Sequence, residues 1–145
     1  MRATIIHNPQ AGRIDVADML PAVSSALKKR GWRIKACSAG IGHDRDLVTL
    51  ARNACEEGID AIFVAGGDGS VGAVATVLSG TDVALGVLPC GTRNVWARGL
   101  GLTAPAYPRG EALVPAVVRQ VTGHVRDVDL GICNGRLFLM WAGMG

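Results

Sequence analysis

A glycine-rich turn near the middle of the chain carries the residue types that handle phosphate groups. The residues Gly66-Gly67-Asp68-Gly69-Ser70 follow an apolar run, 60–65, and precede a segment with helical character, 71–78. A strand, a glycine turn and a helix in this order present main-chain N–H groups to a phosphate. Glycine permits positive φ and removes the Cβ that would keep a phosphoryl oxygen from the backbone.

Asp68 is unusual in such a turn, because a bare carboxylate repels phosphate. Its presence indicates either a divalent cation between the two groups or a carboxylate that accepts the proton of a hydroxyl group. The alternative is a tight turn between strand and helix with a solvated aspartate. The rest of the chain decides between these interpretations.

The elements that must position this turn alternate between strand and helix. Apolar runs predict strands, and apolar residues at helical spacing predict helices. The predicted strands are 3–7, 32–37, 60–65, 83–88, 124–130 and 137–141, and the predicted helices are 16–27, 44–57, 71–78, 94–100 and 111–121. The alternation predicts an α/β fold of three layers, α/β/α, with a mainly parallel sheet.

Three loops rich in small, polar and turn residues are expected at the carboxyl ends of these strands. They are Asn8 to Gly12, Gly66 to Ser70 and Gly91 to Asn94. In open α/β sheets ligands bind outside the carboxyl ends of the strands. The convergence of the three loops favours a phosphate site over a simple turn.

Composition limits the class of protein. The chain has 145 residues, of which 49% are apolar and 20 are glycine, and its net charge is +3. These values favour one compact domain, and so mild a charge is no argument for a nucleic-acid partner. Its four cysteines are widely spaced and form no CxxC pair, which argues against zinc and for a reducing, cytoplasmic setting. The sequence predicts a soluble protein, because no apolar stretch approaches the length of a membrane helix.

Together the three loops resemble the amino-terminal catalytic domain of the diacylglycerol kinase family, which includes bacterial lipid kinases and sphingosine and ceramide kinases. The resemblance is carried by Asn8-Pro9-Gln10-Ala11-Gly12, Gly66 to Ser70, and Pro89-Cys90-Gly91-Thr92-Arg93-Asn94-Val95-Trp96-Ala97-Arg98. A later segment, Val128 to Gly131, resembles the family's crossing into its second domain. The order and spacing of the motifs fit the family from end to end.

The resemblance implies an ATP-dependent kinase that transfers the γ-phosphate of ATP to the hydroxyl group of a diacylglycerol-like or sphingoid lipid. The implied ligands are ATP and Mg²⁺, and the implied partner is a lipid at the membrane surface. The implied location is cytoplasmic, with peripheral association at the inner membrane face. Asp68 would interact with phosphate through magnesium or act in catalysis. The implied nucleotide-binding residues are Asn8, Pro9, Gln10, Ala11, Gly12, Ser38, Gly66, Gly67, Asp68, Gly69, Ser70, Val71, Gly72, Thr92 and Asn94.

The sequence also departs from the family pattern. Gly72-Ala73 stand where many members have Asn-Glu, and Val95 stands where many have Asp. Family members continue into a β-rich second domain that binds lipid, whereas this chain ends at Gly145. We therefore expect a nucleotide-binding domain over 1–123 and the truncated start of a second domain over 124–145.

Two alternatives to a complete lipid kinase remain open. One is a fragment that binds nucleotide without activity of its own. The other is an NAD kinase or a phosphofructokinase-like enzyme, since these also carry a Gly-Gly-Asp-Gly turn. The apolar run 137–141 predicts an exposed edge that pairs with a second copy, so a homo-oligomer is an additional expectation.

Overall fold

A computed structural model describes residues 1–9, 16–40, 46–103 and 111–140 of the chain. Within these residues six strands and five α-helices follow one another, with one 3₁₀ turn at Ala17–Met19. The strands are β1 (Arg2–His7), β2 (Arg33–Ser38), β3 (Ala61–Gly66), β4 (Ala84–Pro89), β5 (Gly131–Cys133) and β6 (Arg136–Phe138). The helices are α1 (Leu20–Lys28), α2 (Leu47–Glu56), α3 (Asp68–Leu78), α4 (Val95–Gly99) and α5 (Val114–Val121).

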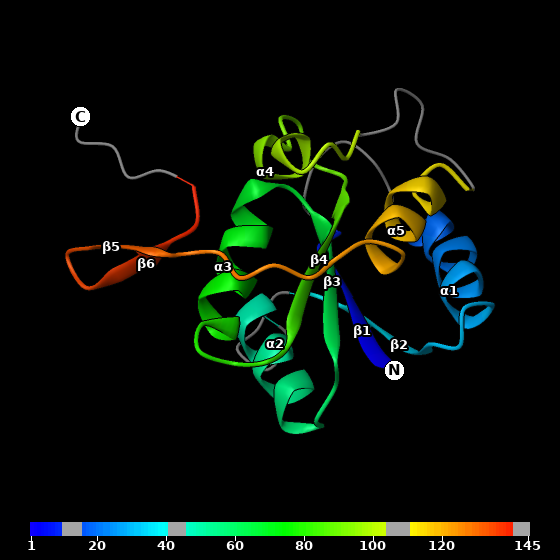
Figure 1. The fold of residues 1–145 in the computed structure, drawn as a ribbon, viewed down its shortest axis with the longest axis horizontal. Coiled ribbons are helices and arrows are strands. Elements are labelled where there is room, and N and C mark those ends of the chain that lie inside the picture. Colours follow the sequence, from blue (N-terminus) through cyan, green and yellow to red (C-terminus); the bar gives the residue numbers. More distant parts are fainter. Residues whose placement is uncertain (10–15, 41–45, 104–110, 141–145) are drawn as a thin grey trace.

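The first four strands form one parallel sheet in the order β2-β1-β3-β4. Helices α1 and α5 cover one face of this sheet, and α2 and α3 cover the other (Figure 1). All six residues of the central strand β3 are buried. The predicted three-layer α/β/α fold is confirmed.

The alternation of side chains along β3 supplies both cores. Phe63 points toward the α1 and α5 side, where it packs with Val23 and Val117. Val64 points the other way and packs with Ala51 and Val74 from α2 and α3. Because successive side chains of a strand face opposite sides, a continuous apolar run is what a strand between two helical layers requires.

Glycines lie just after two helices, and prolines lie in the first turns of two. Gly31 and Gly58 adopt φ of 80° and 66° directly after α1 and α2, which is the left-handed conformation that ends a helix. The Asp46 side chain caps α2 by accepting a hydrogen bond from the Thr49 N–H at 2.7 Å. Pro21 and Pro115 lie in the first turns of α1 and α5, where a missing N–H costs least.

The outer edge of β4 is closed by a side chain of α5. The amide of Gln120 accepts a hydrogen bond from the Val87 N–H at 2.7 Å and donates one to the Val87 carbonyl at 2.8 Å. It makes the pair of bonds that a further strand would make, so this part of the edge is not available for pairing with another chain.

The carboxyl-terminal part differs from the sequence prediction. The predicted strand 124–130 is wrong, because these residues are in no strand and all but the last are exposed. They form the extended connection that leads from α5 to the β5–β6 hairpin (Figure 1). Of the predicted strand 137–141 only the first two residues lie in β6, and Trp141 lies outside the described residues.

The hairpin is set by a turn that the strand prediction missed. Asn134 and Gly135 have φ of 49° and 73°, and β5 and β6 pair antiparallel on either side of them. Two adjacent residues with positive φ form the tight turn that matches the twist of a hairpin, for which Asn-Gly is the favoured sequence. The segment 124–130 has no such partner strand, which is why it stays extended but unpaired.

Among the described residues, no helix is both long enough and apolar enough to cross a membrane.

Candidate functional site

The described parts of the three loops converge at the carboxyl ends of β1, β3 and β4. The Asn8 N–H donates to the Ala65 carbonyl at 3.2 Å, which joins the first loop to the end of β3. The Cys90 N–H donates to the Gly66 carbonyl at 3.1 Å, which joins the third loop to the glycine turn. Gln10, Ala11 and Gly12 lie outside the described residues.

Side chains connect the first two loops as well. The Asn8 amide donates a hydrogen bond to the Ser70 hydroxyl oxygen at 3.3 Å, and Ser70 is buried. Pro9 is exposed beside it. The structure therefore brings residues of the first loop and the glycine turn together, as the sequence predicts.

The glycine turn ends in a helix that starts earlier than predicted. Helix α3 begins at Asp68 with Gly67 as its N-cap residue, and the Val71 N–H donates to the Gly67 carbonyl at 3.1 Å. The N–H groups of Asp68, Gly69 and Ser70 therefore have no partner within the helix. Such a helix end attracts anions, through both its free N–H groups and its dipole.

Gly66 and Gly67 serve close packing rather than positive φ. Gly67 has φ of −95°, and none of Gly66, Gly69 and Gly72 is in the left-handed region. A Cβ on Gly66 would lie 2.7 Å from the Cβ of Ser70, so this glycine makes room for the turn itself. The expectation that the turn needs glycine for its dihedral angles is wrong. The expectation that it leaves space for a phosphate oxygen stays a prediction.

Gly69 and Gly72 differ from the other two glycines of the turn. A Cβ on either would meet no described atom within 4 Å. Val71, between them, is buried in the core beneath α3. The open space at Gly69 and Gly72 lies along the start of α3, where a ligand can approach its N–H groups.

The Asp68 carboxylate joins the glycine turn to α4. Its Oδ2 accepts a hydrogen bond from the Val95 N–H at 3.0 Å, and its Oδ1 accepts one from the Trp96 N–H at 3.1 Å. Asp68 is therefore half-buried and bonded to the main chain, and not wholly solvated. No pattern in the sequence predicts these partners, because they are main-chain groups 27 and 28 residues away.

Asn94 holds the third loop in shape. It is buried and left-handed, with φ and ψ both 48°. Its Oδ1 accepts from the Gly91 N–H at 2.8 Å and its Nδ2 donates to the Gly91 carbonyl at 2.7 Å. Thr92 and Arg93, in the same loop, are exposed.

Ser38 ends β2 beside the first loop. It is paired in register with His7, the last residue of β1. Its hydroxyl donates to the Ala39 carbonyl at 3.3 Å, and the Ala39 N–H donates to the His7 carbonyl at 2.8 Å. Ser38 thus lies at the same end of the sheet as the three loops.

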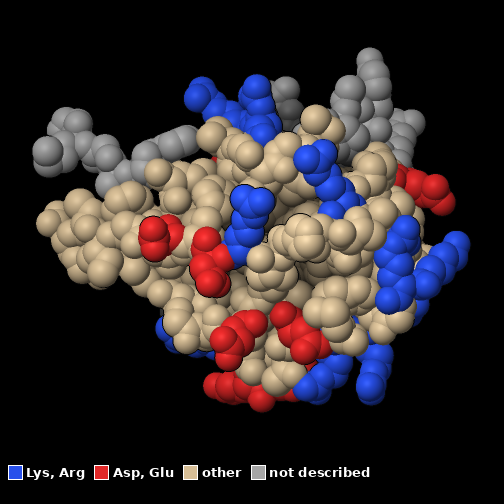
Figure 2. All heavy atoms as spheres, in the orientation of Figure 1, with Lys and Arg blue, Asp and Glu red and all other residues tan. Residues whose placement is uncertain are grey.

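Basic side chains lie at several places on the surface. On the face shown in Figure 2 they lie at the end of the molecule that carries α4, along the side of α1 and at the lower end, where several acidic side chains also gather. Arg93 in the third loop and Arg98 in α4 are both exposed. Exposed guanidinium groups near the loops favour an anionic ligand.

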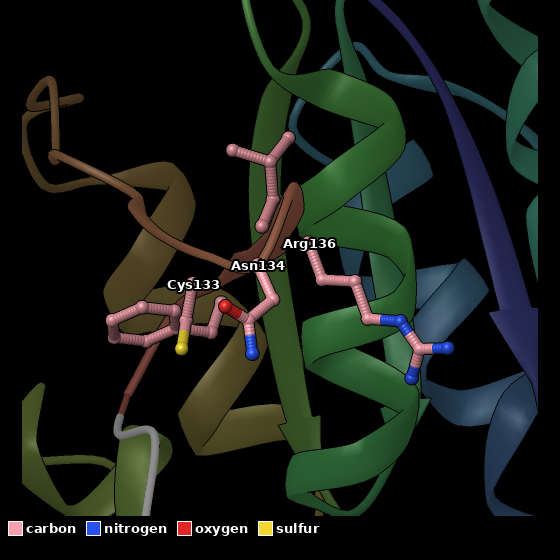
Figure 3. Close-up of a pocket in the computed structure, with 5 residues that line it drawn as sticks. Cys133, Asn134 and Arg136 are labelled. Atoms are coloured by element: carbon pink, nitrogen blue, oxygen red, sulfur yellow. The ribbon is translucent and has the colours of Figure 1, made fainter.

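Two hollows of the described surface lie away from the loops. The larger, of about 520 Å³, is lined by residues of the β5–β6 hairpin alone, among them Cys133, Asn134 and Arg136 (Figure 3). A smaller hollow of about 210 Å³ lies among residues at the amino ends of β1 and β2, including Arg2 and Arg33. The described residues contain no group of three or more acidic, histidine or cysteine side chains that could hold a metal ion.

Comparison with known proteins agrees with the fold and the loops. The family model for the diacylglycerol kinase catalytic domain matches residues 2–133. The diacylglycerol kinase of Bacillus subtilis is 34% identical over 146 residues, which cover 99% of this chain and 46% of that protein. The diacylglycerol kinase of Mycobacterium tuberculosis is 34% identical over 130 residues, which cover 90% of this chain and 40% of that protein.

A solved structure of a diacylglycerol kinase from Bacillus anthracis superposes with a TM-score of 0.72 at 25% identity, covering 95% of this chain and 45% of that chain. The chain therefore spans less than half the length of the relatives it matches. All of these relatives are named diacylglycerol kinases, which favours this family over the NAD kinase and phosphofructokinase alternatives. The match over residues 2–133 shows that the chain belongs to the diacylglycerol kinase catalytic domain family.

Proposed function

We propose that this chain is the nucleotide-binding half of an ATP-dependent lipid kinase. One observation carries the proposal: the start of α3 lies where three loops converge, with N–H groups that have no partner within the helix and with open space at Gly69 and Gly72. Phosphoryl transfer depends on positioning and on stabilisation of charge more than on covalent chemistry. The N–H groups of a helix start can position a phosphate, and nearby exposed arginines can stabilise its negative charge.

Each described part of the site has a proposed task. The N–H groups of Gly69 and Ser70 bind phosphate oxygens, and Asn8 fixes the first loop through Ser70. Thr92 and Arg93 are exposed beside the turn and contact the nucleotide from the third loop. Ser38 borders the nucleotide from the end of β2. Gln10, Ala11 and Gly12 stay proposed nucleotide-binding residues.

Magnesium belongs to the proposal. Asp68 is the only carboxylate in the described parts of the three loops. Each of its oxygens accepts one main-chain hydrogen bond and keeps a further lone pair, which fits a water ligand of the ion. Mg²⁺ retains several waters and uses few protein carboxylates together with substrate phosphates. When bound with ATP, it would neutralise charge on the transferred phosphate.

Diacylglycerol is the proposed substrate, because the similar proteins are named for it. The apolar side chains of the sheet and helices are used in the two cores, so we assign the lipid to a β-rich domain that begins near residue 124. Such an enzyme would act from the cytoplasm at the inner membrane face. The second candidate function is nucleotide binding without phosphorylation by these 145 residues alone, which the short span relative to the relatives favours.

A chimera tests the proposal. This chain replaces the matching amino-terminal part of the Bacillus subtilis diacylglycerol kinase, and the remainder of that enzyme is kept. We expect the chimera to transfer labelled phosphate from ATP to diacylglycerol in mixed vesicles, and the isolated chain to show no transfer. A folded chimera that binds no ATP would contradict the proposal, and so would one that phosphorylates no lipid.

A further inference from the structure

We infer that Asp68 is a positioning residue that fixes α4 and the third loop against the glycine turn before any nucleotide binds. The residue begins α3, and its side chain reaches a helix that starts 27 residues later. It thereby connects the two segments on either side of the proposed phosphate site.

The hydrogen bonds of α4 show why another residue must cap it. An N-cap side chain normally accepts hydrogen bonds from the first N–H groups of its own helix. Asn94 occupies the N-cap position of α4, but it makes no such bond, because its amide is bonded on both sides to Gly91. The Asp68 carboxylate instead accepts hydrogen bonds from the N–H groups of Val95 and Trp96.

A short helix depends strongly on such a cap. Helix α4 has five residues, a length at which a helix has little stability of its own. Hydrogen bonds to an ionised carboxylate are about twice as strong as neutral ones, and a negative charge is favoured at a helix N-terminus. The negative charge and the two oxygens of Asp68 are both used by α4.

The contact between Asp68 and α4 also reduces the repulsion between the aspartate and a nearby phosphate. The partial positive charge of the α4 N-terminus lies against the carboxylate and offsets its repulsion of an anion at the start of α3. This part of the inference rests on the proposed function. Asp68 would then hold the third loop in the conformation that binds nucleotide, and this role does not depend on whether Asp68 also faces magnesium.

Amide hydrogen exchange in the absence of nucleotide and magnesium tests the inference. The proteins compared are the wild-type chain, Asp68→Ala, Asp68→Asn and the control Asp82→Asn, which alters an exposed turn. We expect the Val95 and Trp96 amides to exchange at least tenfold faster in Asp68→Ala, with the β3 amides unchanged. In Asp68→Asn, which keeps the side-chain volume and one acceptor oxygen, one of the two amides should stay protected. Unchanged exchange at both amides in a folded Asp68→Ala or Asp68→Asn protein would overturn the inference.

A second measurement separates positioning from metal binding. ADP affinity is measured for wild type and Asp68→Asn, once with magnesium and once with EDTA. Positioning predicts that the substitution weakens ADP binding by a similar factor in both solutions. A loss confined to the magnesium solution would contradict it. If the wild-type chain binds no ADP at all, the proposed function fails, and the amide exchange still decides the role of Asp68.

Discussion

Gly67 and Gly91 lie so close that a Cβ on Gly91 would be 2.4 Å from the Cα of Gly67. The two residues belong to different loops, and each needs the other to lack a side chain. This contact, with the Cys90 to Gly66 hydrogen bond, holds the second and third loops together without a long side chain.

Gly91→Ala should therefore destabilise the protein. The new methyl group meets backbone that cannot rotate away, and overpacking of this kind costs about 1–3 kcal/mol. Denaturant unfolding measures the loss. Gly99→Ala is the matched control, because a Cβ there meets nothing within 4 Å and alanine favours a helix. Equal stability of wild type and Gly91→Ala would show that the two loops are not held in this contact.

Gln120→Glu should lower stability through the edge of β4. A carboxylate can still accept from the Val87 N–H, but it cannot donate to the Val87 carbonyl, which then faces a negative charge. Leaving a half-buried carbonyl without its donor costs about 1–3 kcal/mol. Urea midpoints of wild type, Gln120→Glu and the neighbouring exposed variant Arg119→Gln measure this cost. An effect of Gln120→Glu no larger than that of Arg119→Gln would contradict the edge assignment.

The cysteines should differ in reactivity. Burial raises the pKa of the Cys90 thiol to about 12, whereas Cys133 is exposed on the hairpin. Since the thiolate is the reactive form, iodoacetamide at pH 8 should modify Cys133 first and Cys90 only after unfolding. Mass spectrometry of peptides from the native and denatured chain reads the order. Early modification of Cys90 in the native chain would show that its site opens.

The raised pKa of Cys90 should lower the stability of the folded chain at high pH. The unfolded chain loses the Cys90 proton near the ordinary pKa of 9.0, while the folded chain keeps it up to about pH 12. Stability from this group is complete below pH 9 and falls as pH rises from 9 to 12. Cys90→Ala should therefore flatten the alkaline limb of the stability profile.

The carboxyl-terminal segment should make the chain self-associate. Val125, Val128 and Ile132 are 79%, 61% and 71% exposed. They lie close together in sequence, and Ile132 belongs to β5 of the hairpin. Exposed apolar side chains that gather in this way favour association between copies. Sedimentation velocity should show oligomers that dissociate in a Val128→Lys, Ile132→Lys double variant. A wild-type chain that stays monomeric at high micromolar concentration would count against this expectation.

The sequence predicts the layers of the fold well, because the buried runs and glycine stops are local signals. The apolar run 60–65 predicts β3 to within one residue, and the turn after it predicts a helix whose observed start, Asp68, is three residues earlier. The segment 124–130 shows the limit of such signals. It has the composition of a strand, but a strand also needs a neighbour, and the Asn134-Gly135 turn pairs two later segments instead.

The sequence predicts that the loops meet at one end of the sheet, but it does not predict the contacts between them. Asp68 and Asn94 are at the place expected, yet the partners of Asp68 are main-chain amides in α4 and those of Asn94 are the main chain of Gly91. Such partners have no sequence signature, because every residue except proline has the same N–H group. Gly67 shows the same limit: its neighbour in space, Gly91, is revealed only by the fold.

The most direct test of the central claim is a calorimetric titration of ATP into this chain and into Gly69→Val. Gly69 is exposed, and a side chain there has open space, so the variant should fold with nearly unchanged stability. If a phosphate of ATP binds at the start of α3, the new side chain occupies its place. We predict that the wild-type chain binds ATP more tightly with magnesium than without it, and that folded Gly69→Val binds ATP at least tenfold more weakly. Equal ATP affinity of the two proteins, or no binding to the wild-type chain, would contradict the account.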